Sequence, residues 1–433
     1  IKSGQRAAIG DTQTALKKHQ IIFQATFSHD VFYIKSDVLA YNKEQNGWEL
    51  YEVKAANEIK RKDPFDYVKD LAFQKNVIES TGLPVVKAKV IYLNRDYRRY
   101  GRIDHHQLFI TEDLTAEVLK AQPQVRKQMA EMKQYLEIPE EKSCECLYRG
   151  RSNHCTTFQY SNPQVPEYSV HDINRIGQSK RILEDWIDRA IYSLDDIDNP
   201  EVLTKAKHHQ YQAYIKNQVY CDRQAISKTL AALKFPLQFF DYEGFVSAIP
   251  AFDGFGPYEQ VPFQYSLHIM DVNGRLTHKE FLITDPGKDL TRPLIEQMIK
   301  DIDPSGTVVS WYSTYEKERN EKLAELHPDH AQFFKRINDG MFDLMDIFAD
   351  CHYVDAAFKG RSSLKIVLPV MVPELSYKSL AISKGDQASE RWEKLIAPQT
   401  QAKVRAQIVR DLKEYCKMDT MAMVKIYEKL TKC

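Results

Sequence analysis

The chain has 433 residues, of which 43% are hydrophobic and 28% charged, with 60 Lys and Arg against 60 Asp and Glu. This length exceeds one ordinary hydrophobic core, so the sequence predicts a soluble globular protein of two or more domains. Zero net charge excludes a global basic field, so any surface for nucleic acid has to be a local basic patch.

The longest apolar runs, such as IVLPVMV, are far shorter than the roughly 20 residues that span a bilayer, so no membrane span is expected. Seven cysteines, three of them bunched, fit a reducing compartment better than a disulfide framework, and we expect a cytoplasmic protein. The sequence begins IKSGQ without a methionine, so a truncated N-terminus or a removed targeting segment stays open.

The N-terminal part alternates apolar and polar residues over 20–57, where IIFQATF, VFYIKSDVLAY and WELYEVKAA predict three strands. The stretch PFDYVKDLAFQKNVIEST at 64–81 predicts a helix that ends at Gly82, and PVVKAKVIYLN predicts the next strand. We therefore expect a compact α/β module up to about residue 140.

Residues 161–235 are polar and predict a helical connector, with RILEDWIDRAIYSLDDI as its most regular stretch. A second α/β module begins at FPLQFFDYEGF, and helices dominate from residue 315 onward. Its predicted strands are 237–242, 261–271, 277–283 and 307–312.

A first candidate site lies in the N-terminal module. Glu52 and Lys54 flank Val53, so their side chains share one face of a strand, and Asp37 lies on the preceding strand. Two carboxylates can bind a divalent cation while an ammonium orients water or stabilises phosphate charge. Gln74, on the following helix, is placed to reach the same site. The alternative is a surface hairpin with alternating charges, since Glu-x-Lys is common.

Cysteines gather in CECLYRGRSNHC, where Cys144, Cys146 and Cys155 lie within twelve residues. Thiolates this close suit a structural zinc or an iron–sulfur cluster. His154 or a cysteine upstream of the chain would complete the ligand set, and three unligated loop cysteines are the alternative. We expect ordinary buried or terminal thiols at the other positions: Cys221, Cys351, Cys416 and Cys433.

The C-terminal module offers a larger set of carboxylates. Asp241 and Glu243 lie at strand spacing in FFDYEGF, where two carboxylates on one face are costly without a cation. VVSWYSTYEKER predicts a strand, a turn and a helix whose first turn holds Glu316. Tyr415 and Asp419, four apart in LKEYCKMDTMAM, share one helix face.

Carboxylates from a strand, a helix start and a late helix favour two divalent ions, Mg²⁺ or Mn²⁺, that clamp a scissile phosphate. Tyr415 would then orient the attacking water or help to deprotonate it. Asp343 is a further candidate, with a helix N-terminal charge as the alternative. Three aromatic residues are candidates for stacking on single-stranded bases, with core or loop packing as the alternative: Phe245, Tyr258 and Tyr265.

Long motifs resemble a bacterial family with a domain of unknown function, described as a predicted RecB-family nuclease fused to an RNase H-like exonuclease. The resemblance covers nearly all of residues 20–433. The stretches that carry it are DVLAYNKEQNGWELYEVKAA, LAFQKNVIESTGL, YLNRDYRRYGRID, CECLYRGRSNHC, DYEGFVSAIPAFDGFGPYEQVPFQYSLH, SSLKIVLPVMVPELSY and EYCKMDT.

The resemblance implies an α/β protein of three parts. Residues 1–160 would form a PD-(D/E)xK, restriction-endonuclease-like domain that ends in the cysteine cluster, and 161–235 the helical connector. Residues 236–433 would form an RNase H-like 3′–5′ exonuclease of the DEDDy type. The PD-(D/E)xK motif would consist of Asp37, Glu52 and Lys54, with Gln74 as its helix glutamine.

In the exonuclease type, Asp241 and Glu243 match the first motif, and Tyr415 with Asp419 matches the third. The second motif normally supplies an aspartate where Glu316 stands, which implies an altered metal set. An acidic residue expected on a first N-terminal helix is not assigned. Related nucleases that hold a [4Fe–4S] cluster place a fourth cysteine far upstream, and this chain has none there. ILEDWIDRAIYSLDDI faintly resembles a helical hairpin that such proteins use on nucleic-acid backbones.

The resulting expectation is a metal-dependent nuclease that acts on nucleic acid, with DNA favoured over RNA and no membrane partner. The ions would be held by Asp241, Glu243 and Asp419 in one module and by Asp37 and Glu52 in the other. One alternative is a nucleic-acid-binding or assembly protein whose nuclease sites have decayed. Another keeps only the N-terminal site active.

Overall fold

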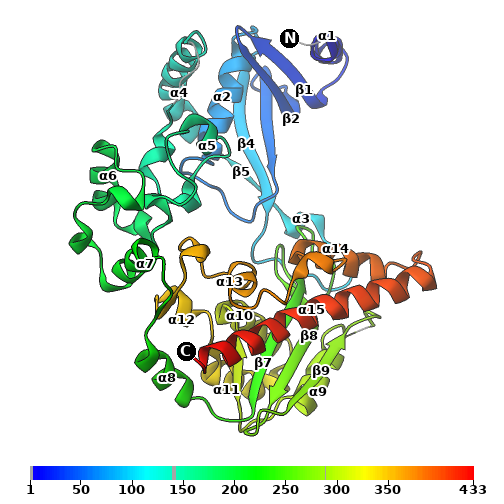
Figure 1. Ribbon diagram of the computed structural model, residues 1–433. Coiled ribbons are helices and arrows are strands. Elements are labelled where there is room, and N and C mark those ends of the chain that lie inside the picture. The colour runs from blue at the N-terminus through cyan, green and yellow to red at the C-terminus, as the bar shows by residue number, and fades with distance from the viewer. Residues whose placement is uncertain (1–2, 139–142, 288) are drawn as a thin grey trace. The chain divides into compact units, whose positions relative to one another are not determined.

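The computed structural model describes residues 3–138, 143–287 and 289–433. The chain divides into two compact units, and Figure 1 shows the elements of each. Unit 1 comprises Ile1–Glu140 and Ser247–Glu259, and unit 2 comprises Glu141–Val246 and Gln260–Cys433. Both units contain a five-stranded sheet with helices packed on it, so the predicted α/β class is confirmed.

The sheet of unit 1 has the order β1–β2–β3–β4–β5. Its strands β3 and β4 are parallel and the other neighbours are antiparallel. The helix α2 (Tyr67–Glu79) makes the crossover that a parallel pair requires. Four of the strand bounds confirm the predicted strands: β1 (Ile21–His29), β2 (Phe32–Asn42), β3 (Gly47–Lys54) and β4 (Val85–Leu93). The edge strand β5 (Phe109–Asp113) was not predicted.

The helix predicted over 64–81 begins at Tyr67, because the carboxylate of Asp66 accepts hydrogen bonds from the first free backbone N–H groups. Its apolar residues, Leu71 and Ile78 among them, are buried in a core shared with the sheet. The other helices of this unit are α1 (Ser3–Leu16), α3 (His105–Leu108) and α4 (Thr115–Tyr135).

The sheet of unit 2 has the order β11–β10–β7–β8–β9. β7, β8 and β9 form an antiparallel meander, whereas β10 and β11 run parallel to β7. Three predicted strands agree with the structure within three residues at each end, and the fourth, 307–312, ends two residues earlier. The bounds are β7 (Leu237–Phe245), β8 (Val261–Met270), β9 (Leu276–Leu282), β10 (Thr307–Ser310) and β11 (Phe342–Asp343).

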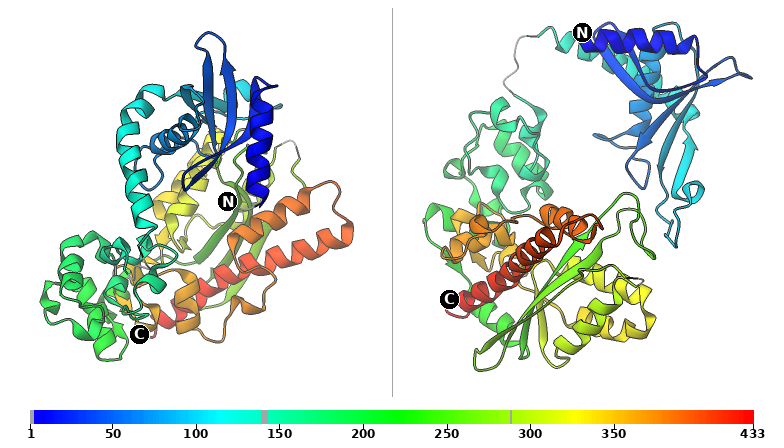
Figure 2. Two further views of the ribbon diagram at one scale, coloured as in Figure 1. Left: turned by 90° about the horizontal axis from the view of Figure 1, so that it is seen from above. Right: turned by 90° about the vertical axis from the view of Figure 1, so that its right-hand side faces the viewer.

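The long last helix, α15 (Ala402–Leu430), packs across β7 and β8 (Figure 2). Its apolar side chains lie in the main core of this unit. This packing brings one face of the last helix onto the strand FFDYEGF. The remaining helices of this part are α8 (Arg223–Ala231), α9 (Arg292–Asp301), α10 (Ser313–Leu326), α11 (Ala331–Gly340), α12 (Asp346–Ala349), α13 (Leu364–Met371) and α14 (Gly385–Ile396).

The predicted connector is less helical than its sequence suggests. Its regular helices are α5 (Phe158–Ser161), α6 (Lys180–Asp188), α7 (Lys205–Ile215) and α8, joined by short 3₁₀ turns. Trp186 and Leu194 are buried in an apolar core of their own, which also takes in Leu147 and Phe158. The cysteine segment therefore packs with these turns and helices. β6 (Tyr220–Cys221) pairs with β12 (Tyr353–Val354).

One cysteine prediction is corrected by the structure. Cys221 and Cys433 were expected as ordinary thiols, but they form a disulfide across 212 residues of sequence, with Cα atoms 6.7 Å apart. The residues before Cys433, such as Leu430, lie in the same core against which Cys221 packs, which brings the two ends together. None of the helices in the described residues combines the length and the apolar character needed to cross a bilayer.

Candidate active site

The first part of the site is the carboxylate pair of β7. Asp241 and Glu243 offer oxygens that lie, together with the Sγ of Cys416 on α15, within 4.8 Å of one another. Glu243 is 7% exposed, and the Cys416 thiol lies 3.9 Å from Oδ2 of Asp241. The strand period places both acidic side chains on one face, and the packing of α15 covers that face.

The second part comes from α15 itself. Tyr415 and Asp419 are both buried, and Oδ1 of Asp419 accepts a 2.5 Å hydrogen bond from the hydroxyl of Tyr377. Lys365 on α13 places its Nζ 3.4 Å from the hydroxyl oxygen of Tyr415 and is held by a 2.8 Å hydrogen bond to the carbonyl oxygen of Ser383. The helix spacing thus puts the phenol and the carboxylate on one buried face, as expected.

Glu316 is the most buried member of the set, at 1% exposure on the first turn of α10. Its Oε2 has no hydrogen-bond partner among the described residues. Asp343 does not join the set, because its carboxylate accepts hydrogen bonds from the backbone N–H groups of Tyr312 and Ser313 at the start of the same helix. Asp343 is therefore a helix cap, the alternative that its sequence context offered.

The surroundings of these carboxyls disfavour their ionised forms. Burial, then the charges of Asp419 and the neighbouring carboxylates, raises the pKa of both Asp241 and Glu243 well above the usual range. Burial raises the pKa of Asp419 to about 6, against the hydrogen bond from Tyr377, and the pKa of Glu316 to about 8. Buried acids this close cannot all ionise without a positive partner.

The donor set fits divalent cations of the Mg²⁺ or Mn²⁺ kind, which prefer carboxylate oxygens. The residues that would hold them are Asp241 and Glu243, which belong to the group within 4.8 Å, and Asp419, whose charge acts on both. The unpartnered oxygen of Glu316 would be a further donor. Sequence reasoning did not find Lys365 or Tyr377 as members of this site. Both lie in SSLKIVLPVMVPELSY, whose residues show no spacing that ties them to α15.

The predicted base-stacking aromatics mostly belong to cores. Tyr265 is 0% exposed with its hydroxyl bonded to Asp301, and Phe245 packs against Trp392. Their ring faces are covered, so the stacking prediction is wrong for these two. Tyr258 is 38% exposed and donates a hydrogen bond from its hydroxyl to the carbonyl oxygen of Ala55 within unit 1.

In unit 1, Lys54 lies between two carboxylates. Its Nζ is 2.8 Å from Oε1 of Glu52 and 2.6 Å from Oδ2 of Asp70, and Gln74 donates to the second oxygen of each. Sequence reasoning missed Asp70, although it stands four before Gln74 and hence on the same face of α2. The structure thus brings Glu52, Lys54 and Gln74 together as expected.

Asp37 is oriented differently. Its Oδ2 accepts a hydrogen bond from the backbone N–H of Val53, and its Oδ1 accepts one from Gln24. In the described part of the chain, Asp37 and Glu52 do not form part of a three-ligand group within 4.8 Å. Burial raises the pKa of Glu52, although Lys54 and Gln74 oppose it. The fit to a metal ion is therefore weaker here than in unit 2.

The three clustered cysteines converge. The sulfur atoms of Cys144, Cys146 and Cys155 lie within 4.8 Å of one another, which suits a zinc ion or an iron–sulfur cluster. A hydrogen bond from Thr157 lowers the pKa of Cys155 to about 7, so part of this thiol is ionised at neutral pH. His154 lies outside the group, because its Nε2 bonds to the carbonyl of Arg149 and its ring stacks on Phe158.

Residues 238–363 match a family model described as Domain of unknown function (DUF2779), which includes Asp241, Glu243 and Glu316 but ends before α13 and α15. The chain is 30% identical over 210 residues to an uncharacterized protein (MG366 homolog) of Mycoplasma pneumoniae, covering 43% of this chain and 31% of that protein. It is 25% identical over 290 residues to an uncharacterized protein (UU173) of Ureaplasma parvum, covering 62% of this chain and 40% of that protein. The chain thus spans between 31% and 40% of the length of these relatives. No solved structure matches the chain.

Proposed function

We propose that unit 2 is a metal-dependent nuclease that hydrolyses phosphodiester bonds of nucleic acid from the 3′ end, with DNA favoured over RNA. The observation that carries this proposal is the set of buried carboxylates from β7, α10 and α15, in which one oxygen of Glu316 has no partner. A mixed sheet with two acidic residues on its central strand is compatible with the RNase H-like DEDDy type that the sequence resembles.

When bound, the divalent ions supply charge stabilisation for the scissile phosphate and lower the pKa of a coordinated water. Asp241, Glu243 and Asp419 would hold the ions, and Glu316 would take the place of the usual aspartate. The chain's own contribution is to fix these oxygens in a covered site, where electrostatic interactions are stronger than in water.

Tyr415 acts as a hydrogen-bond donor to the attacking water and not as its base. Burial, and then the charge of Asp419, raises the pKa of this phenol far above its usual range, so the hydroxyl keeps its proton at neutral pH. The ammonium of Lys365, 3.4 Å from the same hydroxyl, adds positive charge to the site. It also favours the ionised forms of Glu243 and Asp419.

A second nuclease site of the PD-(D/E)xK kind is proposed in unit 1. The observation in its favour is that Lys54 contacts Glu52 and Asp70 while Gln74 bonds to both carboxylates. Zinc or a [4Fe–4S] cluster is proposed at Cys144, Cys146 and Cys155, on the convergence of their sulfur atoms.

The test is the degradation of end-labelled single- and double-stranded DNA and RNA in Mn²⁺ by the wild type, Asp241→Asn and Lys54→Ala. Stepwise shortening from the 3′ end that Asp241→Asn abolishes supports the exonuclease, and loss of cleavage only in Lys54→Ala assigns activity to unit 1. Glu414→Gln is the matched control, because Glu414 is an exposed acid on the same helix as Asp419. If all proteins leave every substrate intact but bind it in chelator, a binding or assembly role replaces the nuclease.

A further inference from the structure

A cavity in unit 2 is lined by basic side chains that the carboxylate site does not use. It has a volume of about 740 Å³ and lies between three segments, 150–153, 171–178 and 359–361. The volume is many times the roughly 30 Å³ that one water occupies in the liquid, so it has room for a charged group and its neighbours. Four cationic residues line this basic cavity: Arg151, Arg175, Lys359 and Arg361.

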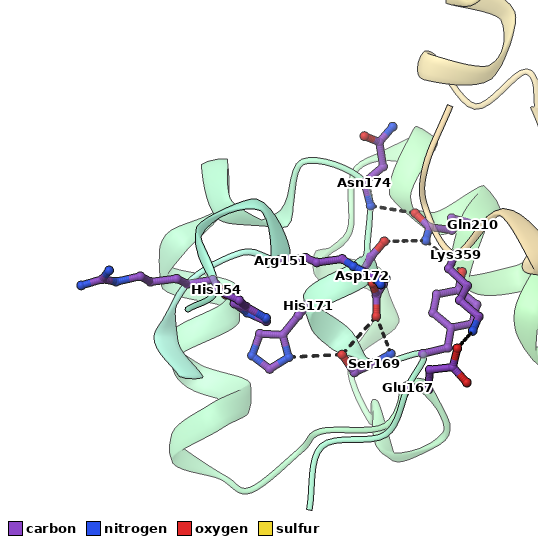
Figure 3. A network of polar contacts seen from close by, with 11 residues as sticks. Arg151, His154, Glu167, Ser169, His171, Asp172, Asn174, Gln210 and Lys359 are labelled. Atoms are coloured by element: carbon purple, nitrogen blue, oxygen red, sulfur yellow. Dashed lines mark hydrogen bonds and ion pairs between the residues drawn. The ribbon is translucent and has the colours of Figure 1, made fainter. Parts of the chain in front are cut away.

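Two of the four cations are held in place by carboxylates (Figure 3). Arg151 pairs with Asp172, whose buried carboxylate also accepts hydrogen bonds from the backbone N–H and the hydroxyl of Ser169. Lys359 pairs with Glu167. These pairs fix the two side chains and balance their charge, so the remaining charge of the cavity comes from elsewhere.

That charge belongs to Arg175 and Arg361. Both are exposed, and in the ranges that the structure describes their guanidinium groups make no hydrogen bond or ion pair. Arg175 has φ +52, a left-handed conformation, at the turn before residues 176–178. Burial raises the pKa of Asp346, an effect that the positive charge of Arg175 opposes. The hydrogen bond from Lys359 lowers the pKa of Glu167, and the positive charge of Arg361 contributes to this lowering. The four cations therefore outnumber the three acids Asp172, Glu167 and Asp346 by one positive charge, and the guanidinium groups of Arg175 and Arg361 are available to bind an anion.

The walls of the basic cavity are closely packed and hydrogen-bonded to one another. Gln210 is buried, donates to the carbonyl oxygen of Asp172 and accepts from the backbone N–H of Asn174 (Figure 3). Gly360 has φ +67 and lies so close that a Cβ there would overlap the Asp172 carbonyl. A Cβ at Gly150 would lie 3.1 Å from Cα of Gly177. Segments 150–153 and 359–361 thus pack closely against segment 171–178. This packing defines the backbone positions of the four cationic residues.

We propose that the basic cavity binds consecutive phosphates of a nucleic-acid strand, with Arg175 and Arg361 as the groups that contact them. The inference rests on the proposed function, since it identifies where the substrate strand is held outside the carboxylate site. Guanidinium groups bind phosphate oxygens in a bidentate manner, and such contacts recognise the backbone without reading the sequence. A phosphodiester strand uses both free guanidinium groups and the length of the cavity, whereas a single inorganic phosphate needs only one of them.

The test is binding of fluorescent 12-mers of single-stranded DNA and RNA in EDTA, followed by anisotropy over a range of salt concentrations. Four proteins are compared: the wild type, Arg175→Ala/Arg361→Ala, Arg175→Lys/Arg361→Lys and the control Lys228→Ala/Lys300→Ala. The control removes two exposed positive charges from α8 and α9 of the same unit. A second arm measures competition by inorganic phosphate and pyrophosphate, and thermal melts check that each variant is folded.

We expect the alanine variant to bind about tenfold more weakly, with a salt slope smaller by about 1.4, the value for two lost contacts to a single strand. The lysine variant keeps the charge but loses the bidentate geometry, so its affinity should lie between those of the alanine variant and the wild type. The control should match the wild type. Equal weakening in the alanine variant and the control overturns the proposal. The proposal is also overturned if the alanine variant loses binding of phosphate or pyrophosphate but binds the oligonucleotides as well as the wild type does. The cavity would then be a site for small anions. If the wild type cleaves no substrate but binds strands in a way that depends on the two arginines, this inference is supported and the proposed nuclease function fails.

Discussion

The hydroxyl of Tyr377 donates a 2.5 Å hydrogen bond to Oδ1 of Asp419, which stands 42 residues further along the chain. Burial raises the pKa of Asp419, and this hydrogen bond opposes the rise by stabilising the ionised carboxylate. Because a carboxylate must be ionised to bind a metal ion, this hydrogen bond would raise the metal affinity of the proposed site.

Replacing Tyr377 by phenylalanine should weaken Mn²⁺ binding by about 10- to 100-fold, the usual cost of removing a partner that orients a ligand. Isothermal titration of the metal-free protein with Mn²⁺ measures this change. Tyr427→Phe is the control, because Tyr427 lies on the same helix and packs against Phe239 outside the carboxylate set. Equal Mn²⁺ affinity in the wild type and Tyr377→Phe would show that the hydrogen bond has no such role.

Metal binding should stabilise unit 2, because it neutralises acids that are costly to bury. We expect Mn²⁺ to raise the midpoint of thermal unfolding of the wild type by several degrees, and to leave that of Asp241→Asn unchanged. Glu316→Gln removes the most buried carboxyl, so at pH 8.5 the metal-free variant should unfold at a higher temperature than the metal-free wild type. An equal Mn²⁺ effect in Asp241→Asn would place the metal site elsewhere.

The three clustered cysteines should hold metal in protein purified without oxygen. Cys155→Ser is expected to lower the zinc or iron content per chain to a small fraction of the wild-type value, since it removes one of three converging thiols. Elemental analysis measures the zinc and iron content. Absorbance at about 400 nm distinguishes an iron–sulfur cluster from zinc. Cys351→Ser is the control, a buried cysteine that lies outside the group. Metal-free wild type would contradict this prediction.

Acid sensitivity of unit 1 should depend on Glu49. Burial raises the pKa of this carboxyl, but hydrogen bonds from Lys89, Tyr51 and Asn42 outweigh burial and lower the pKa to about 2. A depressed pKa in the folded state stabilises the protein above the ordinary value near 4.5, and this stabilisation is lost as the pH falls from there through about 2.

Glu49→Gln should therefore lower the free energy of unfolding by roughly 2 kcal/mol at pH 7, with a smaller difference from the wild type at pH 2.5. Urea unfolding of the whole chain at both pH values, followed by tryptophan fluorescence, measures the effect because Trp48 lies in the same core. Glu44→Gln, in the exposed turn after β2, is the control. A pH-independent difference would mean that Glu49 acts through packing alone.

Eight of the ten strands in the two sheets were predicted from sequence, because their apolar and polar residues form strand-like patterns. The edge strands β5 and β11 were missed, and β11 has only two residues. The two residue pairs of the carboxylate site could also be predicted, because each pair lies within a few residues of sequence. The strand period places Asp241 and Glu243 on one face, and the helix period does the same for Tyr415 and Asp419. The sequence could not predict the disulfide between Cys221 and Cys433, or that Asp343 caps the start of α10, since each depends on which segments pack side by side.

The sequence by itself determined which side chains share a face of one strand or one helix, because the backbone repeat sets that arrangement within a few residues. Only the tertiary structure decided which faces meet. The packing of α15 on β7 brings Cys416 to Asp241, and the bond from Tyr377 reaches Asp419 across a loop. Residues 150, 177 and 360 come together in the same way around the basic cavity. Such contacts join residues that are far apart in the chain. They form because whole hydrophobic faces are buried against one another, and local spacing does not encode which faces meet.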